Sequence, residues 1–386
     1  MAILFREHPL HQMGEAKLVR SGKEFFDELV QLIREAKSYL HIQFYIFDED
    51  ETGKRIQQAL LDAAQRGVKV ACIIDGYASG NWSKKTLLQF KDARILFRRF
   101  APVHFKRLKI GRRMHHKICL IDGHTALVGG INIANKYNAL GNREPWLDFA
   151  ILLKGHAVTD IDHICEKMWP RRKLKTFPDG RVVIKSTTSM EKLPIRVLQN
   201  NWFQRRIEIS KAYKNALRQA DTEVILVASY FFPGLSMRRL MKRAVDRGVR
   251  IVLITGSYSD VTLFKPASKF LYDWLLRHRV EIYEWQKSVL HGKIAVVDRH
   301  WVTVGSYNLN ALSDYGSLEL NAAIYQNEFA EVVRKRVMQI LEEGCAPIAE
   351  IEFKKKSTLL LQVHRWFSYQ IIRLGMRFLF VLMRRL

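Results

Sequence analysis

The chain has 386 residues, 48% of them hydrophobic and 26% charged, and this composition is that of a globular protein large enough for two cores. It excludes an intrinsically disordered chain, a collagen-like repeat and a multi-span membrane protein. The 63 basic residues exceed the 38 acidic ones by 25, so a polyanionic partner is predicted, either nucleic acid or an anionic membrane surface.

Cysteine usage and the N-terminus predict the compartment. The four cysteines lie far apart and form no CxxC pair, so we expect neither a disulfide framework nor a zinc site, and a reducing compartment. The apolar run 2–5 is followed at once by charged residues and is shorter than the apolar core of a secretory signal. No cleaved targeting segment is expected.

Helical and strand-like patterns alternate from the N-terminus onward. An amphipathic stretch at 25–36 precedes an apolar run at 39–47, and a second helical pattern at 56–65 precedes a run that ends at Gly76. Short runs rich in Val, Ile and aromatic residues between helical patterns are typical of buried strands in an α/β protein.

The second half of the chain repeats this order. The helical pattern 207–219, the apolar run 223–232, the helical pattern 237–246 and the run that ends at Gly256 follow one another as in the first half. We therefore predict a duplicated α/β chain. Its predicted parts are a first repeat at 1–185, a second repeat at 186–345 and a basic tail at 346–386, with the connection inside the basic stretch 171–206.

Each half also carries one polar pattern, HxKxxxxDxxxxxxGxxN. The two copies are spaced by 176 residues at every fixed position. They comprise His115, Lys117, Asp122, Gly129 and Asn132 in the first half, and His291, Lys293, Asp298, Gly305 and Asn308 in the second. One copy would be a weak motif, whereas two copies in register within duplicated halves predict a site.

Strand geometry indicates which of these side chains share a face. Residues two apart on a strand point the same way, so each His lies beside its Lys, and the apolar run that follows predicts a strand buried on both faces. A turn at each Asp would return the chain antiparallel and bring each Asn back to the His-Lys end. By parity Asp122 and Asp298 point away from this end, which predicts a structural or supporting role.

On these residues the chain resembles the phospholipase D superfamily, and most of all the bacterial cardiolipin synthases that lack N-terminal transmembrane helices. The resemblance rests on the motif regions 109–136 and 285–312, with DGY at 75–77 and YFFPG at 230–234. It implies an α/β fold of two phospholipase D-like repeats packed about a pseudo-twofold axis with one shared active site.

Two histidines and two lysines supply phosphodiester chemistry without a metal or cofactor. One neutral imidazole attacks phosphorus, and the other, protonated, donates its proton to the departing alcohol and later deprotonates the incoming one. The resemblance implies that His115 is the nucleophile and His291 the acid and base, although the near symmetry of the motifs leaves this order open. Lys117, Lys293, Asn132 and Asn308 are expected to hold the phosphoryl oxygens.

Further residues are assigned by the same resemblance. Asp148 and Glu319 match the carboxylates that orient the histidines, with a surface carboxylate at a strand end as the alternative. Ser306 stands where the first copy has Gly130, so a hydroxyl contact with phosphate would be one-sided. His116 is expected on the strand face opposite to His115, and the aromatic residues at 45 and 230–232 are expected in the core.

Two basic regions bear on the partner. Between residues 93 and 121 nine Lys or Arg and no acids lead into His115. From Lys354 to the C-terminus there are again basic but no acidic residues, and no apolar block approaches the roughly 20 residues that span a bilayer. At helical spacing Arg365, Arg373, Arg377 and Arg384 gather on one side, which predicts an interfacial helix, with a helix packed on the protein's own core as the alternative.

The chemistry and the tail predict a peripheral phosphatidyltransferase, and the resemblance implies that its product is cardiolipin. Its expected partners are an anionic phospholipid membrane and phospholipid substrates, phosphatidylglycerol as acceptor and phosphatidylethanolamine as a further candidate substrate. Its expected place is the cytoplasmic side of a bacterial inner membrane. A phospholipid hydrolase of the phospholipase D type is one alternative. A nuclease of the same superfamily, with nucleic acid as partner, is the less favoured one.

Overall fold

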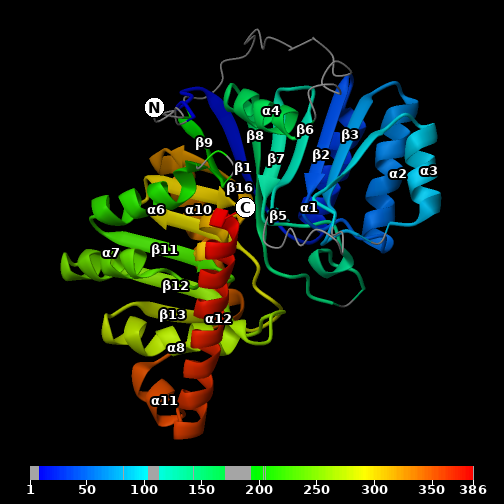
Figure 1. Cartoon of the computed structure of the whole chain (residues 1–386). Coiled ribbons are helices and arrows are strands. Elements are labelled where there is room, and N and C mark those ends of the chain that lie inside the picture. The colour runs from blue at the N-terminus through cyan, green and yellow to red at the C-terminus, as the bar shows by residue number, and fades with distance from the viewer. Residues whose placement is uncertain are drawn as a thin grey trace.

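The computed structural model describes residues 8–80, 82–102, 113–141, 143–169, 193–202, 204 and 206–385, the last seven of these by their backbone alone. It consists of two halves, each a sheet with helices, that meet along one face of each sheet (Figure 1). The basic residues at 106, 107, 109 and 112 of the predicted approach to His115 lie outside the described residues.

The first half is built on a seven-stranded sheet in the order β1-β8-β7-β6-β2-β3-β4. Its elements are β1 (Gly14–Arg20), α1 (Lys23–Glu35), β2 (Tyr39–Phe44), α2 (Glu51–Gln65), β3 (Lys69–Asp75), α3 (Lys84–Asp92), β4 (Leu96–Phe100), β5 (Arg113–Met114), β6 (Lys117–Ile121), β7 (Thr125–Gly129), a 3₁₀ turn (Asn135–Tyr137), β8 (Phe149–Gly155) and α4 (Ala157–Lys167).

The second half is built on a larger sheet in the order β10-β9-β16-β15-β14-β11-β12-β13-β17, to which β5 of the first half adds beside β16. Its elements are β9 (Ile195–Asn201), β10 (Arg206–Ile207), α6 (Glu208–Gln219), β11 (Glu223–Ala228), α7 (Leu235–Asp246), β12 (Arg250–Gly256), α8 (Phe264–Arg277), β13 (Glu281–Trp285), β14 (Lys293–Val297), β15 (Trp301–Gly305), α9 (Ala311–Tyr315), β16 (Ser317–Tyr325), α10 (Asn327–Gly344), β17 (Cys345–Pro347), α11 (Glu350–Lys355) and α12 (Leu359–Arg385).

The two motif strands occupy equivalent places. β6 pairs antiparallel with β2, with Lys117 opposite Phe44, and β14 pairs antiparallel with β11, with Lys293 opposite Ala228. Every residue of β6 and β14 is buried, because helices cover one face of each sheet and the other half of the molecule covers the second face. The predicted central strands buried on both faces are confirmed.

One hydrophobic core joins the halves. It contains Ile118 and Phe149 from the first sheet together with Val227 and Ile294 from the second, and helices α4 and α10 contribute to the same cluster. The outer faces are covered separately, by α1, α2 and α3 in the first half and by α6, α7 and α8 in the second. The predicted packing of two α/β repeats against each other is therefore confirmed.

The structure adds two strands to the predicted organisation. Residues 195–201, within the basic stretch 171–206, form β9 and pair with β16, which agrees with a second repeat that begins before them. Residues 345–347, at the expected start of the tail, form β17 and extend the same sheet beside β13. Weak periodicity concealed β9, because this near-edge strand mixes polar and apolar residues, and β17 is only three residues long.

The tail folds into two helices, α11 and α12, and α12 runs across the second half (red in Figure 1). It packs against α8 and α9. Among the residues that the structure describes, no helix combines the length and apolarity needed to cross a membrane.

Candidate active site

Each motif histidine is attached to the opposite half of the molecule by backbone hydrogen bonds. β5 pairs parallel with β16, and the amide of His115 donates to the carbonyl of Leu318 at 3.0 Å. In the pseudo-equivalent place, the amide of His291 donates to the carbonyl of Leu147 at 2.7 Å. The segments before β6 and β14 thus cross the junction and carry both histidines into it.

This crossing gives each histidine a carboxylate from the other half. Nδ1 of His115 lies 2.8 Å from Oε2 of Glu319, and Nδ1 of His291 lies 2.6 Å from Oδ2 of Asp148. Both carboxylates are fully buried. Because an ionised carboxylate only accepts hydrogen bonds, Nδ1 of each ring carries the proton and Nε2 is left to react. Both carboxylates that the resemblance assigns thus lie against motif histidines, each against the histidine of the opposite half.

The motif lysines lie beside the same rings. Nζ of Lys117 donates to the carbonyl of His115 at 2.8 Å, and Nζ of Lys293 donates to the carbonyl of His291 and lies 3.7 Å from Oδ2 of Asp148. Both lysines are almost completely buried. Burial lowers the pKa of Lys117 to about 7 and also lowers the pKa of Lys293, in each case against the opposing charge of the carboxylates.

The charges of the two motif lysines affect the pKa values of both motif histidines. Burial lowers the pKa of His115, and the charges of Lys117 and Lys293 lower it further. Burial and the charges of Lys293 and Lys117 also hold the pKa of His291 well below its usual range. Both imidazoles are therefore neutral at neutral pH in the free enzyme's site, and a bound phosphodiester anion would offset the lysine charges and favour protonation of one ring.

The pH dependence of the enzyme follows from these groups. Burial raises the pKa of Asp148 to about 6, so its carboxylate is present above that pH and lost below it, while Lys117 loses its charge above about 7. We expect kcat/KM to have a bell-shaped profile with its maximum between these values, since kcat/KM reports the free enzyme. Lys117→Arg should move the alkaline limb to higher pH; an unmoved limb would assign it to another group.

Asn132 and Asn308 form hydrogen bonds with neighbouring segments at the edge of the site. Asn132 accepts from the amide of Ile46 at 3.0 Å and donates to the hydroxyl of Tyr137, and Asn308 accepts from the hydroxyl of Ser229. The return strands do bring both asparagines back to the His-Lys end, as predicted. Their side chains bind neighbouring segments of the protein.

Ser306 differs from its expected role. Its hydroxyl donates to Oε2 of Glu319 at 2.5 Å, so it supports the carboxylate that binds His115. In the first copy a Cβ atom on Gly130 would come within 2.3 Å of the Asp148 carboxylate. Ser306 therefore lies beside the carboxylate of Glu319, whereas the place of Gly130 beside the carboxylate of Asp148 leaves no room for a side chain.

Asp122 and Asp298 belong to the repeated motif but are not brought to the site, and they take the structural role that strand parity predicts. They follow the far ends of β6 and β14, about 15 Å from the lysines at the rise of a strand. The carboxylate of Asp122 accepts three backbone amides, from Lys37, Ser38 and Tyr39, and that of Asp298 accepts the amides of residues 221–223. Each tether fixes the start of the neighbouring strand.

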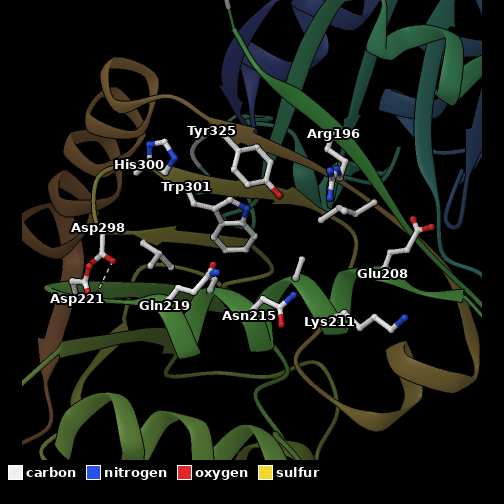
Figure 2. A pocket seen from close by; sticks show the side chains of 14 residues that line it. Arg196, Glu208, Lys211, Asn215, Gln219, Asp221, Asp298, His300, Trp301 and Tyr325 are labelled. Atoms are coloured by element: carbon white, nitrogen blue, oxygen red, sulfur yellow. Dashed lines mark hydrogen bonds between the residues drawn. The ribbon is translucent and has the colours of Figure 1, made fainter. Parts of the chain in front are cut away.

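Figure 2 shows the surroundings of Asp298 beside a pocket of about 500 Å³ between α6 and the second sheet. The dashed line marks the hydrogen bond from Asp221. This pocket lies at the end of β14 remote from Lys293, so it is separate from His115 and His291. Its wall includes Trp301 and Tyr325.

We expect Asp122→Ala and Asp298→Ala to weaken the fold and spare the chemistry. Burial alone would raise the pKa of each carboxyl, but the amide hydrogen bonds outweigh it and lower the pKa, so this stabilisation is present near neutral pH and lost on acidification. Leaving several amides without an acceptor should cost about 3 kcal/mol of unfolding free energy. Urea unfolding measures the loss, with the exposed Asp62→Ala as control, and a large fall in kcat of the folded enzyme would contradict it.

Sequence reasoning missed several side chains of the site. Tyr45, expected in the core, packs edge-on against His115 with ring centroids 4.9 Å apart, and Tyr230 does the same against His291 at 5.8 Å. Behind the first motif, Tyr39, His41, Gln43 and His116 form a buried hydrogen-bonded chain. Polar residues two apart in the apolar run of β2 were the available signal.

The comparisons with known proteins agree with this geometry. The family model described as "Cardiolipin synthase, PLD-like domain" matches residues 29–169 and 213–341. Cardiolipin synthase B of Escherichia coli K12 is 31% identical over 356 residues, which cover 89% of this chain and 84% of that protein. The cardiolipin synthase B of Salmonella typhi is 32% identical over 352 residues with the same coverage. The structure is also similar to that of phosphatidylserine synthase from Haemophilus influenzae, with a TM-score of 0.75, 14% identity and 97% of each chain covered.

The fold and the paired motifs define an enzyme of the phospholipase D type, a phospholipid phosphatidyltransferase. Within that class, the chain belongs to the cardiolipin synthase family with the PLD-like domain.

Proposed function

We propose that the enzyme transfers a phosphatidyl group from one phospholipid to the free hydroxyl of phosphatidylglycerol and so makes cardiolipin. The observation that carries the proposal is the pair of imidazoles, each with Nδ1 bound to a buried carboxylate of the other half. Such pairing leaves two reactive Nε2 atoms in one site, which a two-step transfer needs.

In the first step Nε2 of His115 attacks the phosphorus of the donor lipid. A phosphorus–nitrogen bond forms, the bond from phosphorus to the headgroup oxygen breaks, and protonated His291 gives its proton to that oxygen. In the second step neutral His291 takes the proton of the acceptor hydroxyl, the acceptor oxygen bonds to phosphorus, and His115 is released. Lys117 and Lys293 neutralise the charge that grows on the phosphoryl oxygens.

Product identity tests the proposal. Purified enzyme is incubated with vesicles that contain labelled phosphatidylglycerol, with and without phosphatidylethanolamine, beside a His115→Ala control and a labelled nucleic acid. Cardiolipin formed only with intact His115 supports transfer. Phosphatidic acid without cardiolipin would show that water is the acceptor and the enzyme a hydrolase, and cut nucleic acid with untouched lipid would show a nuclease.

The same proposal places the enzyme on the surface of an anionic membrane, at the cytoplasmic face of a bacterial inner membrane. The net charge of +25 favours adsorption to anionic lipid, and the substrates reside in that surface. Nucleic acid would satisfy the charge but not the apolar surface of the tail.

A further inference from the structure

Helix α12 is held to the body of the protein by the side that was expected to face the lipid headgroups. Tyr369 is buried against Phe232 and Phe270, with ring centroids 5.0 and 4.6 Å away. On the same side of the helix, Ile372 packs against the core of the second half, and the guanidinium of Arg365 lies 4.6 Å from the ring of Phe353.

The predicted arrangement of the arginines is therefore wrong in part. Arg365 and Arg373 are half-buried on the protein side of α12, whereas Arg377 is exposed. The guanidinium of Arg373 lies 6.0 Å from the ring of Tyr369. Both guanidinium groups therefore lie near aromatic rings of the tail helices, Phe353 on α11 and Tyr369 on α12, where cation–π attraction favours them.

The outward side of α12 is consequently apolar. Its members recur at intervals of three and four residues and form a single stripe along the helix, which we call the outer stripe. The outer stripe consists of Leu360, Val363, Phe367, Ile371, Leu374 and Phe378, which are 44% to 83% exposed. A soluble surface helix carries the opposite pattern, so a stripe of this length marks a contact surface.

Apolar residues are also exposed at the edge of the second half that carries the active site. α9, which α12 contacts, follows the motif residue Asn308 and exposes Leu312 and Tyr315. The segments that follow β11 and β12 at the same edge expose Leu235 and Tyr258. The outer stripe and the rim of the site therefore belong to adjoining parts of the molecule.

We propose that the outer stripe lies in the interface of an anionic phospholipid bilayer and, with the exposed rim residues, sets the active site against the membrane. The inference rests on the proposed function for its substrate and adds the surface through which that substrate arrives. A phosphodiester at headgroup depth would then reach His115 and His291 without leaving the bilayer.

Charge favours a bilayer over a second copy of the chain as the occupant of the outer stripe. From Lys354 onward the tail contains basic residues and no acidic residue, so two copies would bring like charges together. An anionic lipid surface attracts the same charges, with about 1 kcal/mol per basic residue near it. Exposed Trp366, beside the outer stripe, suits the boundary between acyl chains and headgroups.

The test uses the full chain and the double variant Phe367→Glu, Leu374→Glu. The matched control is Val332→Glu, at a valine on α10 that is as exposed as the stripe residues but lies in the helix on the other face of the second sheet. Binding is measured by co-sedimentation with phosphatidylglycerol–phosphatidylcholine vesicles, and turnover is measured on both these vesicles and monomeric short-chain phosphatidylglycerol.

The double variant should bind vesicles at least about tenfold more weakly, because each stripe residue loses apolar burial in lipid. Its turnover of the monomeric lipid should stay within about twofold of wild type, and the control should match wild type in both assays.

Unchanged vesicle binding would overturn the proposal. So would a lipid-free dimer of the wild type that the variant dissociates, since a second copy would then cover the stripe. Vesicle binding is measured without turnover, so the two proposals fail separately. If the double variant loses vesicle binding but the wild type makes no cardiolipin, the proposed reaction is rejected and the proposed membrane surface is kept.

Discussion

His115→Ala is expected to lower phosphatidyl transfer by about four orders of magnitude or more, because no other group replaces an attacking nucleophile. His291→Ala should lower it by about two to four orders, the usual contribution of a general acid and base. The rates alone do not separate the roles, since both variants are severely impaired.

A donor with a good leaving group separates them. A labelled p-nitrophenyl phosphodiester needs no proton on its departing oxygen, so His291→Ala should regain formation of the covalent adduct, and the adduct should accumulate because its release still needs the base. His115→Ala should form none. Acid-labile, alkali-stable label on the protein identifies the phosphohistidine, and label in His115→Ala but not in His291→Ala would reverse the assignment.

The carboxylates should have the second largest effect, and the pairing across the halves dictates its pattern. Glu319→Gln and Asp148→Asn each replace an acceptor-only carboxylate with an amide that can present a donor to Nδ1, which disturbs the ring's orientation and tautomer. We expect each to lower kcat by about two to three orders of magnitude.

The two variants should differ on the activated donor. Glu319→Gln acts on the nucleophile His115 and should stay slow, whereas Asp148→Asn acts on His291 and should be rescued in adduct formation. Glu284→Gln is the control, because Glu284 is a buried carboxylate of the second half that binds Tyr272 outside the site. The opposite pattern of rescue would mean that each carboxylate serves the histidine of its own half.

Much of the site was predictable because its signal is local. Strand alternation places His115 beside Lys117 and His291 beside Lys293, and the two runs behind them need only burial on both faces. Parity also separates Asp122 and Asp298 from the lysines, in agreement with their positions as strand tethers. What was not predictable locally was their contact with the start of β2 and β11, some 80 residues away.

The rest depended on contacts between distant parts of the chain. The histidine–carboxylate pairs join residues separated by 204 and 143 positions, and they form because β5 adds to β16 and the segment before His291 pairs with Leu147. The spacing of residues along the sequence does not indicate which strand of the other half a given strand edge will pair with. The side of α12 that turns inward was decided in the same way.

By itself the sequence determined the duplicated α/β halves, the two motif strands and the residue types of the phosphodiester chemistry, since each follows from periodicity and repetition along the chain. Tertiary structure alone decided that each imidazole is oriented from the opposite half and that α12 presents its apolar stripe outward. In both cases the outcome depends on which surfaces pack together, and the aromatic residues at 232, 270 and 353 favoured the tyrosine and arginine side of α12 over its leucine and phenylalanine side.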